Sequence, residues 1–391
     1  MKLIFTLIFF LIFSNICLSQ SFTMNQGGTM TKNYYVELPY ENINGKIVLT
    51  ALIKNKPHRF LFDTGAPTAL SEELARQIGA EAIHSTIARD VNGHADSISV
   101  IKLNDIKLGS ITFSGVAAMR FLPALYKCWN VEGVIGSNLL RNSIVRIIST
   151  KHLIILTDQP DKLSLDKKYS TALITNEGNN VQSNPVLKVN LKNKVNVTIA
   201  FDTGDNGFLR LSDDYMSQLS KFGVYETIGK GYGASQIGGG GLQADAAKFR
   251  LKIPFLNIGS ARFENVITET NRGTAPAFGT KLLEYGDVTL DFVNGKFYCD
   301  PYNEKVDLNE KFWPFEPIVT GQKLVVGLIW DNGVNMIKPG EQIIAVNDEI
   351  FSNVDLCDML NRKPILADKN SAIITLKDSN AVERKVKIIK E

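Results

Sequence analysis

Two segments of the chain carry the same tripeptide behind an apolar run: "FLFDTGAPTAL" (residues 60–70) and "IAFDTGDNGFLRL" (residues 199–211). Each segment places an aspartate, Asp63 or Asp202, at the end of a stretch that is typical of a buried strand. A carboxylate is costly to bury unless it is paired or takes part in chemistry. The glycine that follows permits a tight turn, which brings backbone N–H groups to the carboxylate. These two segments therefore decide the fold.

The surroundings of the two tripeptides repeat as well. Residues 46–62 and 186–201 each predict two strands joined by a turn that contains Lys-Asn-Lys. Downstream, "GVIG" (133–136) has its counterpart in "AFG" (277–279), at similar distances from the two aspartates: 136 − 63 = 73 and 279 − 202 = 77 residues. Self-similarity of this kind indicates two copies of one structural unit.

A short helix is predicted after each tripeptide. Ser71 and Ser212 are the expected N-caps, because each is followed by two acidic residues that would favour the first turn. Past the second copy, a polar stretch with three prolines leads to a third unit with its own strands and one helix. The expected organisation is a signal peptide (1–19), a first repeat (32–158), a linker (159–179), a second repeat (180–300), a linker (301–315) and a third unit (316–391).

The first twenty residues, "MKLIFTLIFFLIFSNICLSQ", have one Lys, a short apolar core and a small polar end. This pattern predicts an export signal cleaved after Ser19, and hence a periplasmic or extracellular protein. The alternative is a lipid anchor on Cys17, but the residues before Cys17 lack the Leu and small side chains of a lipoprotein site. No later apolar run is long enough for a membrane span.

Three cysteines remain after the signal peptide, namely Cys128, Cys299 and Cys357. We expect three buried small hydrophobic residues, with a bridge between Cys128 and Cys299 as the alternative. The net charge is +3 and no basic run is interleaved with aromatic residues, so we expect no nucleic-acid partner. The four histidines show no metal-ligand spacing, and no metal or other cofactor is expected.

Taken together, the doubled Asp-Thr-Gly and the apolar-apolar-Gly signatures resemble aspartic proteases of the retropepsin and pepsin group. They are most similar to bacterial secreted aspartyl proteases that end in a PDZ domain. The resemblance implies a mainly β, two-lobed fold with an internal pseudo-twofold repeat, followed by a small α/β PDZ-like domain. It also implies a secreted endopeptidase that acts on polypeptides.

The site residues follow from this resemblance. Asp63 and Asp202 would form the catalytic pair, in which like charge makes the two carboxylates share one proton. The residues that follow each aspartate would support the pair; they are Thr64, Gly65 and Ala66 in the first repeat and Thr203, Gly204 and Asp205 in the second. Ala66 and Asp205 stand where many relatives have a hydroxyl, which predicts raised pKa values for the pair; in the alternative, Asp205 only bonds its own turn.

A β-hairpin flap usually closes over the substrate in this group. The segment 88–100, with a turn at Asn92-Gly93-His94, is the candidate in the first repeat, although it lacks the Tyr found in pepsins. In the second repeat the equivalent region contains four consecutive glycines, 238–241. We expect these glycines to form a mobile loop rather than a phosphate cradle, because no lysine follows.

In the third unit, "KPGE" (338–341) followed by "IIAVND" (343–348) resembles the turn and strand of a bacterial PDZ domain, with a helix over 354–360. PDZ domains bind an extended C-terminal peptide at a sheet edge, near Gly321 to Leu324 here. The alternative is a domain that only packs against the protease. In either case we expect the third unit to add no acid, base or oxyanion donor to the catalytic pair, so that cleavage of short peptides does not depend on it.

One alternative function and one alternative oligomeric arrangement stay open from the sequence alone. The chain could be a proteolytically inactive scaffold that presents the PDZ-like module, although both Asp-Thr-Gly tripeptides are intact. It could also dimerise between chains, but one chain already holds both loops, so we expect a monomer.

Overall fold

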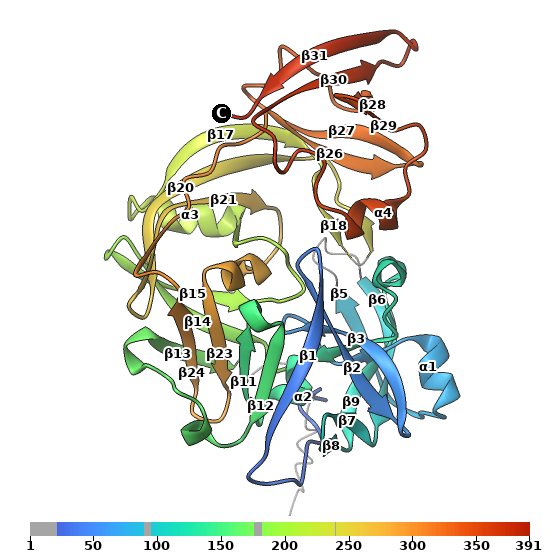
Figure 1. The fold of residues 1–391 in the computed structure, drawn as a ribbon, viewed down its shortest axis with the longest axis vertical. Helices are drawn as coiled ribbons and strands as arrows, with labels where there is room; N and C mark the ends of the chain where they lie inside the picture. Colours follow the sequence, from blue (N-terminus) through green and yellow to red (C-terminus); the bar gives the residue numbers. More distant parts are fainter. Residues whose placement is uncertain (1–21, 90–94, 176–181, 239) are drawn as a thin grey trace, which may run out of the picture.

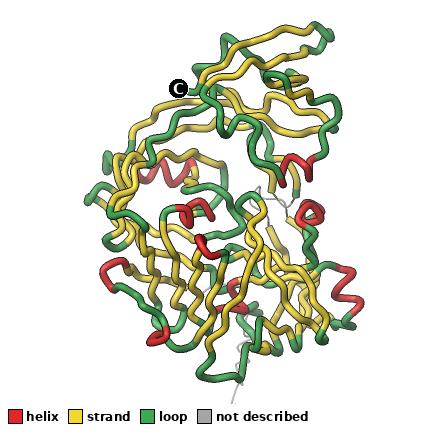
Figure 2. The backbone as a smooth tube through the Cα atoms, in the orientation of Figure 1, coloured by secondary structure: helices red, strands yellow, loops and turns green. Residues whose placement is uncertain are grey.

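The two repeats fold alike around their Asp-Thr-Gly loops. A computed structural model describes residues 22–89, 95–175, 182–238 and 240–391. It is mainly β, as predicted, and Figure 1 and Figure 2 show strands throughout with only short helices between them. No helix among the described residues is long and apolar enough to cross a membrane. The predicted signal peptide, with Cys17, lies outside the described residues.

Strands of the first repeat position its aspartate. Strand β3 ends at Asp63 and pairs in parallel with β10, so that Asp63 lies opposite Gly136. Strand β4 then pairs with β10 from the other side. The elements here are β1 (Tyr35–Ile43), β2 (Lys46–Ile53), β3 (Lys56–Asp63), β4 (Ala69–Leu70), α1 (Glu72–Gln77), β5 (Ala82–Arg89), β6 (Ala95–Leu103), β7 (Ile106–Leu108), β8 (Ile111–Phe113), β9 (Val116–Arg120), the 3₁₀ helix η1 (Ala124–Trp129), β10 (Gly133–Gly136), α2 (Ser137–Leu140), β11 (Ile144–Ile148) and β12 (Leu153–Thr157).

The second repeat uses the same pairing scheme. Strand β15 runs parallel to β22, with Phe201 opposite Phe278, and β16 flanks β22 on its other side. Its elements are β13 (Ser170–Thr175), β14 (Pro185–Leu191), β15 (Val195–Phe201), β16 (Leu209–Ser212), α3 (Asp213–Ser220), β17 (Glu226–Gly233), β18 (Ile237–Gly238), β19 (Gly241–Leu242), β20 (Ala246–Ile258), β21 (Ala261–Asn271), β22 (Ala277–Phe278), η5 (Thr280–Glu284), β23 (Gly286–Asp291) and β24 (Lys296–Pro301).

The helices after the tripeptides start where the sequence predicts. The Ser71 hydroxyl accepts a hydrogen bond from the Leu74 N–H at 3.1 Å, and the Ser212 hydroxyl accepts one from the Tyr215 N–H at 3.1 Å. Both N-cap predictions are therefore confirmed.

A shared antiparallel sheet joins the repeats behind the loops, in the order β1, β12, β11, β23, β24, β13. Most of its buried apolar side chains belong to one core that spans both repeats, while Ile144 and Ile155 belong to a separate small cluster. Both segments predicted as linkers carry strands: β13 lies within 159–179, and β25 (Lys305–Asp307) lies within 301–315 and pairs with β21.

The third unit has a separate core and sits at the top of Figure 1. Its sheet runs β26 (Phe315–Thr320), β27 (Lys323–Trp330), β28 (Gln342–Val346), β30 (Ser371–Lys377) and β31 (Glu383–Ile389), with β29 (Glu349–Ile350) beside β28. Its one helix, α4 (Leu356–Asn361), begins two residues later than predicted, capped by Asp355.

Candidate active site

The two Asp-Thr-Gly loops are locked to each other by symmetric hydrogen bonds. The Thr64 N–H donates to the Thr203 hydroxyl at 3.0 Å, and the Thr203 N–H donates to the Thr64 hydroxyl at 3.1 Å. Each hydroxyl in turn donates across to the other repeat: Thr64 to the Phe201 carbonyl at 2.7 Å, and Thr203 to the Phe62 carbonyl at 2.8 Å. Both threonines are fully buried, so these bonds fix the two loops in one geometry.

The same symmetry holds for the carboxylates. Asp63 Oδ1 accepts from the Gly65 N–H at 2.9 Å, and Asp202 Oδ1 accepts from the Gly204 N–H at 2.9 Å. Each glycine faces the opposite carboxylate so closely that a Cβ atom at Gly204 would lie 2.5 Å from Asp63 Oδ2, and one at Gly65 would overlap Asp202. Glycine is therefore required at both positions for the two carboxylates to approach.

Burial governs the electrostatics of this pair. Asp63 is 5% exposed. Burial, followed by the negative charge of Asp202, raises the pKa of Asp63. Burial, followed by the charge of Asp205, raises the pKa of Asp202. Both shifts favour a shared proton at a pH where isolated carboxyl groups are ionised.

Two cations offset this cluster of carboxylates. Lys46, at the start of β2, donates through Nζ to the Gly204 carbonyl. Burial lowers its pKa, while the charges of the three aspartates raise it. Arg210, on β16, pairs with Asp205 and lies 3.8 Å from Asp202 Oδ2. When the pair holds one proton, two negative charges on the three aspartates face two positive charges.

Asp205 combines both roles that the sequence left open. Its Oδ1 accepts from the Gly207 N–H at 2.7 Å, which is the turn bond of the simpler alternative. Its Oδ2 pairs with Arg210, and its charge also raises the pKa of Asp202. Ala66 lines the same cavity as the pair and has no hydroxyl to donate to it.

A cavity of about 910 Å³ opens over the carboxylates. Its volume is at the upper end of the range for ligand-binding sites. Tyr126 and Trp129 of η1 line it, and the centres of their two rings lie 5.4 Å apart in an edge-to-face arrangement. Burial, followed by the charges of Asp63 and Asp202, raises the pKa of Tyr126 well above its usual value. Tyr126 therefore remains a neutral phenol at the edge of the site.

The predicted flap is described only in part. Strands β5 and β6 form an antiparallel hairpin, and Thr86, Ile87 and Ile98 from them line the cavity. Asn92, Gly93 and His94 lie outside the described residues. In the second repeat β18 pairs with β19, with Gly238 opposite Gly241, and Gly238 also lines the cavity.

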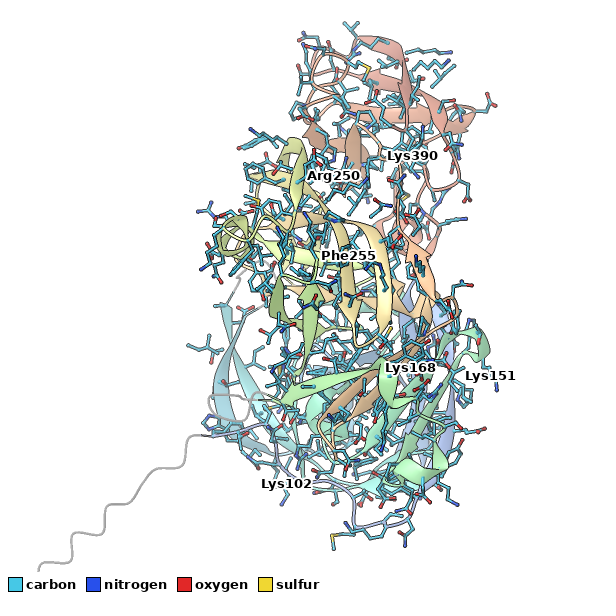
Figure 3. The ribbon with its side chains drawn as sticks, turned by 90° about the vertical axis from the view of Figure 1, so that its left-hand side faces the viewer. Lys102, Lys151, Lys168, Arg250, Phe255 and Lys390 are labelled. Carbon is cyan, nitrogen blue, oxygen red and sulfur yellow. A yellow bond between two sulfur atoms is a disulfide. The ribbon has the colours of Figure 1, made fainter. Side chains whose placement is uncertain are left out.

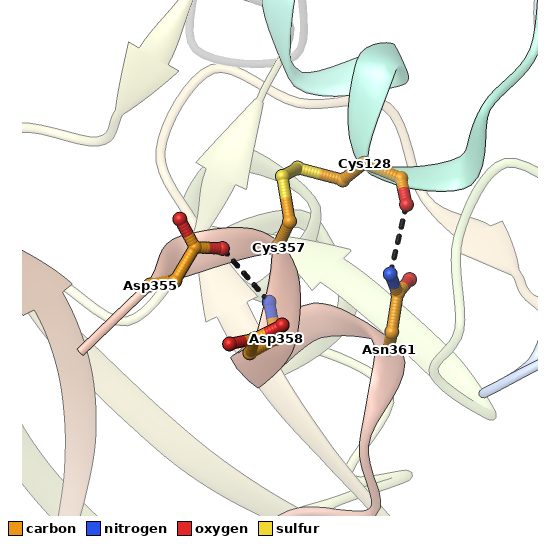
Figure 4. Close-up of a disulfide and its surroundings, with 5 residues drawn as sticks. All are labelled: Cys128, Asp355, Cys357, Asp358 and Asn361. Atoms are coloured by element: carbon orange, nitrogen blue, oxygen red, sulfur yellow. Dashed lines mark hydrogen bonds between the residues drawn. A yellow bond between two sulfur atoms is a disulfide. The ribbon is translucent and has the colours of Figure 1, made fainter.

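A disulfide joins Cys128 of η1 to Cys357 of α4, with the Cα atoms 4.7 Å apart. Figure 4 shows α4 held against η1, where the Asn361 side chain also donates to the Cys128 carbonyl at 2.8 Å. The expectation of three unpaired cysteines and the alternative bridge from Cys128 to Cys299 are both wrong. Among the described cysteines only Cys299 is free; it is buried on β24, and the fold brings the third unit rather than β24 to η1.

The sequence missed several residues of the site. Lys46 and Arg210 belong to ordinary strand patterns, and nothing near them in the chain signals a partner. The third unit also contributes apolar side chains to the cavity, which the sequence did not predict.

Among the described residues, no group of three or more His, Cys, Asp or Glu side chains could hold a metal ion. The site offers two facing carboxylates, each accepting a backbone N–H, in a cavity lined by both polar and apolar side chains. Such a pair can take a proton from a bound molecule and donate one to it.

Comparisons with known proteins point the same way for part of the chain. Residues 49–139 match the family model of aspartyl proteases, a stretch that includes Asp63-Thr64-Gly65 and Val134-Ile135-Gly136. No curated protein matches the sequence.

Similar solved structures include a retropepsin-like aspartic protease from Rickettsia conorii, with 23% identity over 32% of this chain and 94% of that chain and a TM-score of 0.25. Conglutin gamma from lupine seeds matches at 12% identity over 70% of this chain and 96% of that one, with a TM-score of 0.38. Basic 7S globulin from soybean matches at 11% identity over 68% and 95%, with a TM-score of 0.36. The family match thus supports an aspartic protease family, and it is carried by the first repeat.

Proposed function

We propose that this chain is an aspartic endopeptidase with Asp63 and Asp202 as its catalytic pair. The observation that carries the proposal is the symmetric contact of the two Asp-Thr-Gly loops, with each carboxylate facing the glycine of the other loop. One chain supplies both loops, so we propose that a monomer suffices for activity.

The mechanism follows from a pair that shares one proton. The ionised carboxylate takes a proton from a water molecule between the two groups, and the water oxygen attacks the peptide carbonyl carbon. The protonated carboxyl donates its proton to the carbonyl oxygen, which gives a neutral tetrahedral diol. The diol collapses when one carboxyl gives its proton to the leaving nitrogen, the other carboxylate takes a proton from a diol hydroxyl, and the C–N bond breaks. The products are a carboxylic acid and an amine, and the pair again holds one proton.

We also propose that the protein is exported to the periplasm or the cell exterior. The disulfide between Cys128 and Cys357 supports this, because such bonds persist in oxidising compartments. We further propose that the third unit is PDZ-like. Its support is the turn at 338–341, which leads into β28, and the single helix α4.

The test is hydrolysis of a mixed peptide library by the wild type and by the Asp63→Asn and Asp202→Asn variants. Each variant should lose activity by about a thousand-fold or more, and the double variant should be no worse, because the pair acts as one unit. Asp214→Asn, an exposed position on α3, is the matched control and should keep wild-type activity. Near wild-type turnover in either single variant would show that this pair is not the catalytic centre.

A further inference from the structure

The third unit is attached to both repeats, one on each side of the cavity. On the side of the second repeat, β27 pairs with β17, with Tyr232 opposite Ile329, so the sheet continues from one unit into the other. On the side of the first repeat, the disulfide binds α4 to η1, and the Asn44 side chain donates to the Leu360 carbonyl at 3.0 Å. The third unit therefore spans the cavity as a fixed part of the molecule.

Side chains of the third unit line the same cavity as Asp63 and Asp202. They come from β26, from the start of β27 and from α4 and the residues after it: Pro317, Ile318, Val319, Leu324, Leu356, Met359, Leu360, Pro364 and Ile365. All of them are apolar. Ile318 and Leu356 are half-buried and belong to none of the hydrophobic cores, so they are available to contact a ligand.

Strand β26 borders the cavity with its edge. Among the described strands it pairs only with β27, which leaves its other edge with unpaired N–H and C=O groups. Residues 317, 318 and 319 all line the cavity. Because neighbouring side chains on a strand point to opposite faces, three consecutive lining residues indicate that β26 presents its edge to the cavity. Pro317 fits this position, because proline within sheets is confined to edges and bulges. An extended peptide can add to such an edge as a further strand.

The first repeat adds apolar side chains next to those of the third unit. Leu122, Leu125 and Tyr126, from the segment around η1, line the same cavity and pack against the same hydrophobic cluster as Leu360. This apolar surface and the two carboxylates border one cavity. A peptide bound along β26 would therefore continue into the site where Asp63 and Asp202 lie.

We infer that the third unit forms a substrate-binding wall of the catalytic cleft: the outer edge of β26 pairs with an internal, extended stretch of the substrate, and Ile318 and Leu356 receive its bulky apolar side chains. This inference deepens the proposed function and rests on it for the identity of the substrate. The occupant is a continuous polypeptide segment. It is not a free chain end held by its carboxylate.

The test measures binding without hydrolysis. An array of ten-residue peptides, each with either a free or an amidated C-terminus, is probed with full-length protein that carries Asp202→Asn. The same protein with Ile318→Ser or Leu356→Ser is then compared, and Ile373→Ser serves as the matched control. Ile373 lies on β30 of the same unit, is 48% exposed and does not line the cavity. The melting temperature of each variant verifies folding.

We expect amidated peptides to bind as well as free ones, with a preference for Leu, Phe or Met at one position. Ile318→Ser and Leu356→Ser should weaken binding of those peptides by at least about tenfold, while peptides with Ser at that position and the Ile373→Ser control are unaffected. Unchanged affinity in both folded variants, or binding that requires a free carboxylate, would overturn the inference.

Failure of the proposed function would look different. If the wild type cuts no peptide and yet the array shows binding that depends on Ile318 and Leu356, the peptide-binding role of the third unit is supported and the catalytic assignment is wrong. If the wild type cuts peptides with a specificity profile that neither substitution changes, the catalytic assignment is supported and the peptide-binding role of the third unit is wrong.

Discussion

Among the residues around the two carboxyl groups, Lys46 is the cation that acts on both Asp63 and Asp202. Its ammonium group donates to the Gly204 carbonyl and lowers the pKa values of Asp63 and Asp202 against the effect of burial. Its position over the Trp129 ring, 5.3 Å from the ring centre, keeps it at the cavity rather than in bulk solvent. The lysine therefore limits how far the carboxyl pKa values rise.

Replacing this lysine should move the pH dependence of catalysis. In Lys46→Met the carboxyl pKa values rise further, so both limbs of the profile of kcat/KM against pH should shift upward, by about one pH unit. Lys54→Met is the matched control, because Lys54 also donates to a backbone carbonyl but lies exposed in the turn after β2. A profile that stays in place in Lys46→Met would show that the ammonium charge does not reach the pair.

At the scale of elements, the junction between β17, β20 and β27 joins the third unit to the second repeat. Arg250 of β20 lies between two rings, 3.9 Å from the centre of Trp330 and 4.2 Å from that of Phe312. Figure 3 shows it at the side of the second repeat that faces the third unit. The Trp330 indole donates to Glu316 at 3.2 Å, and burial, followed by the charge of Glu269, raises the pKa of Glu316.

This half-buried carboxyl should make the stability of the protein pH-dependent. The native state holds the Glu316 proton more tightly than the unfolded state, whose carboxyl pKa is near 4.5. Stability contributed by this group is therefore full below that pKa and is lost as the pH rises through the folded value, by about 1.4 kcal/mol per unit of pKa difference. Glu316→Gln should lose less stability between pH 5 and pH 8 than the wild type in urea unfolding. The exposed substitution Glu383→Gln should follow the wild type, and equal losses in all three proteins would refute the role of Glu316.

The local elements were largely predictable from the sequence, and their long-range partners were not. Ser71 and Ser212 cap helices as predicted, because capping depends on residues within one turn. The contact of Thr64 with Thr203 was expected from the internal repeat, because two copies of one unit can bring their Asp-Thr-Gly loops together. Cys128 and Cys357 are 229 residues apart, and their pairing depends on how a whole unit packs against η1. No local pattern encodes that packing.

For the whole molecule, the disulfide should contribute to stability and hold the third unit in place. The double variant Cys128→Ser/Cys357→Ser should be less stable than the wild type by about 2–4 kcal/mol. A reductant should lower the melting temperature of the wild type to that of the variant and leave the variant itself unchanged. If the reductant exposes the thiols of Cys128 and Cys357 and the melting temperature of the wild type does not fall, the bond adds nothing to stability.

The same bond gives the chain an unusual covalent topology. Because it links residues 128 and 357, the second repeat lies entirely within one closed ring of backbone and sulfur. A single cut at any peptide bond inside that ring would open it without releasing a fragment. A molecule nicked there by a protease would keep its full mass until a reductant separated the two pieces.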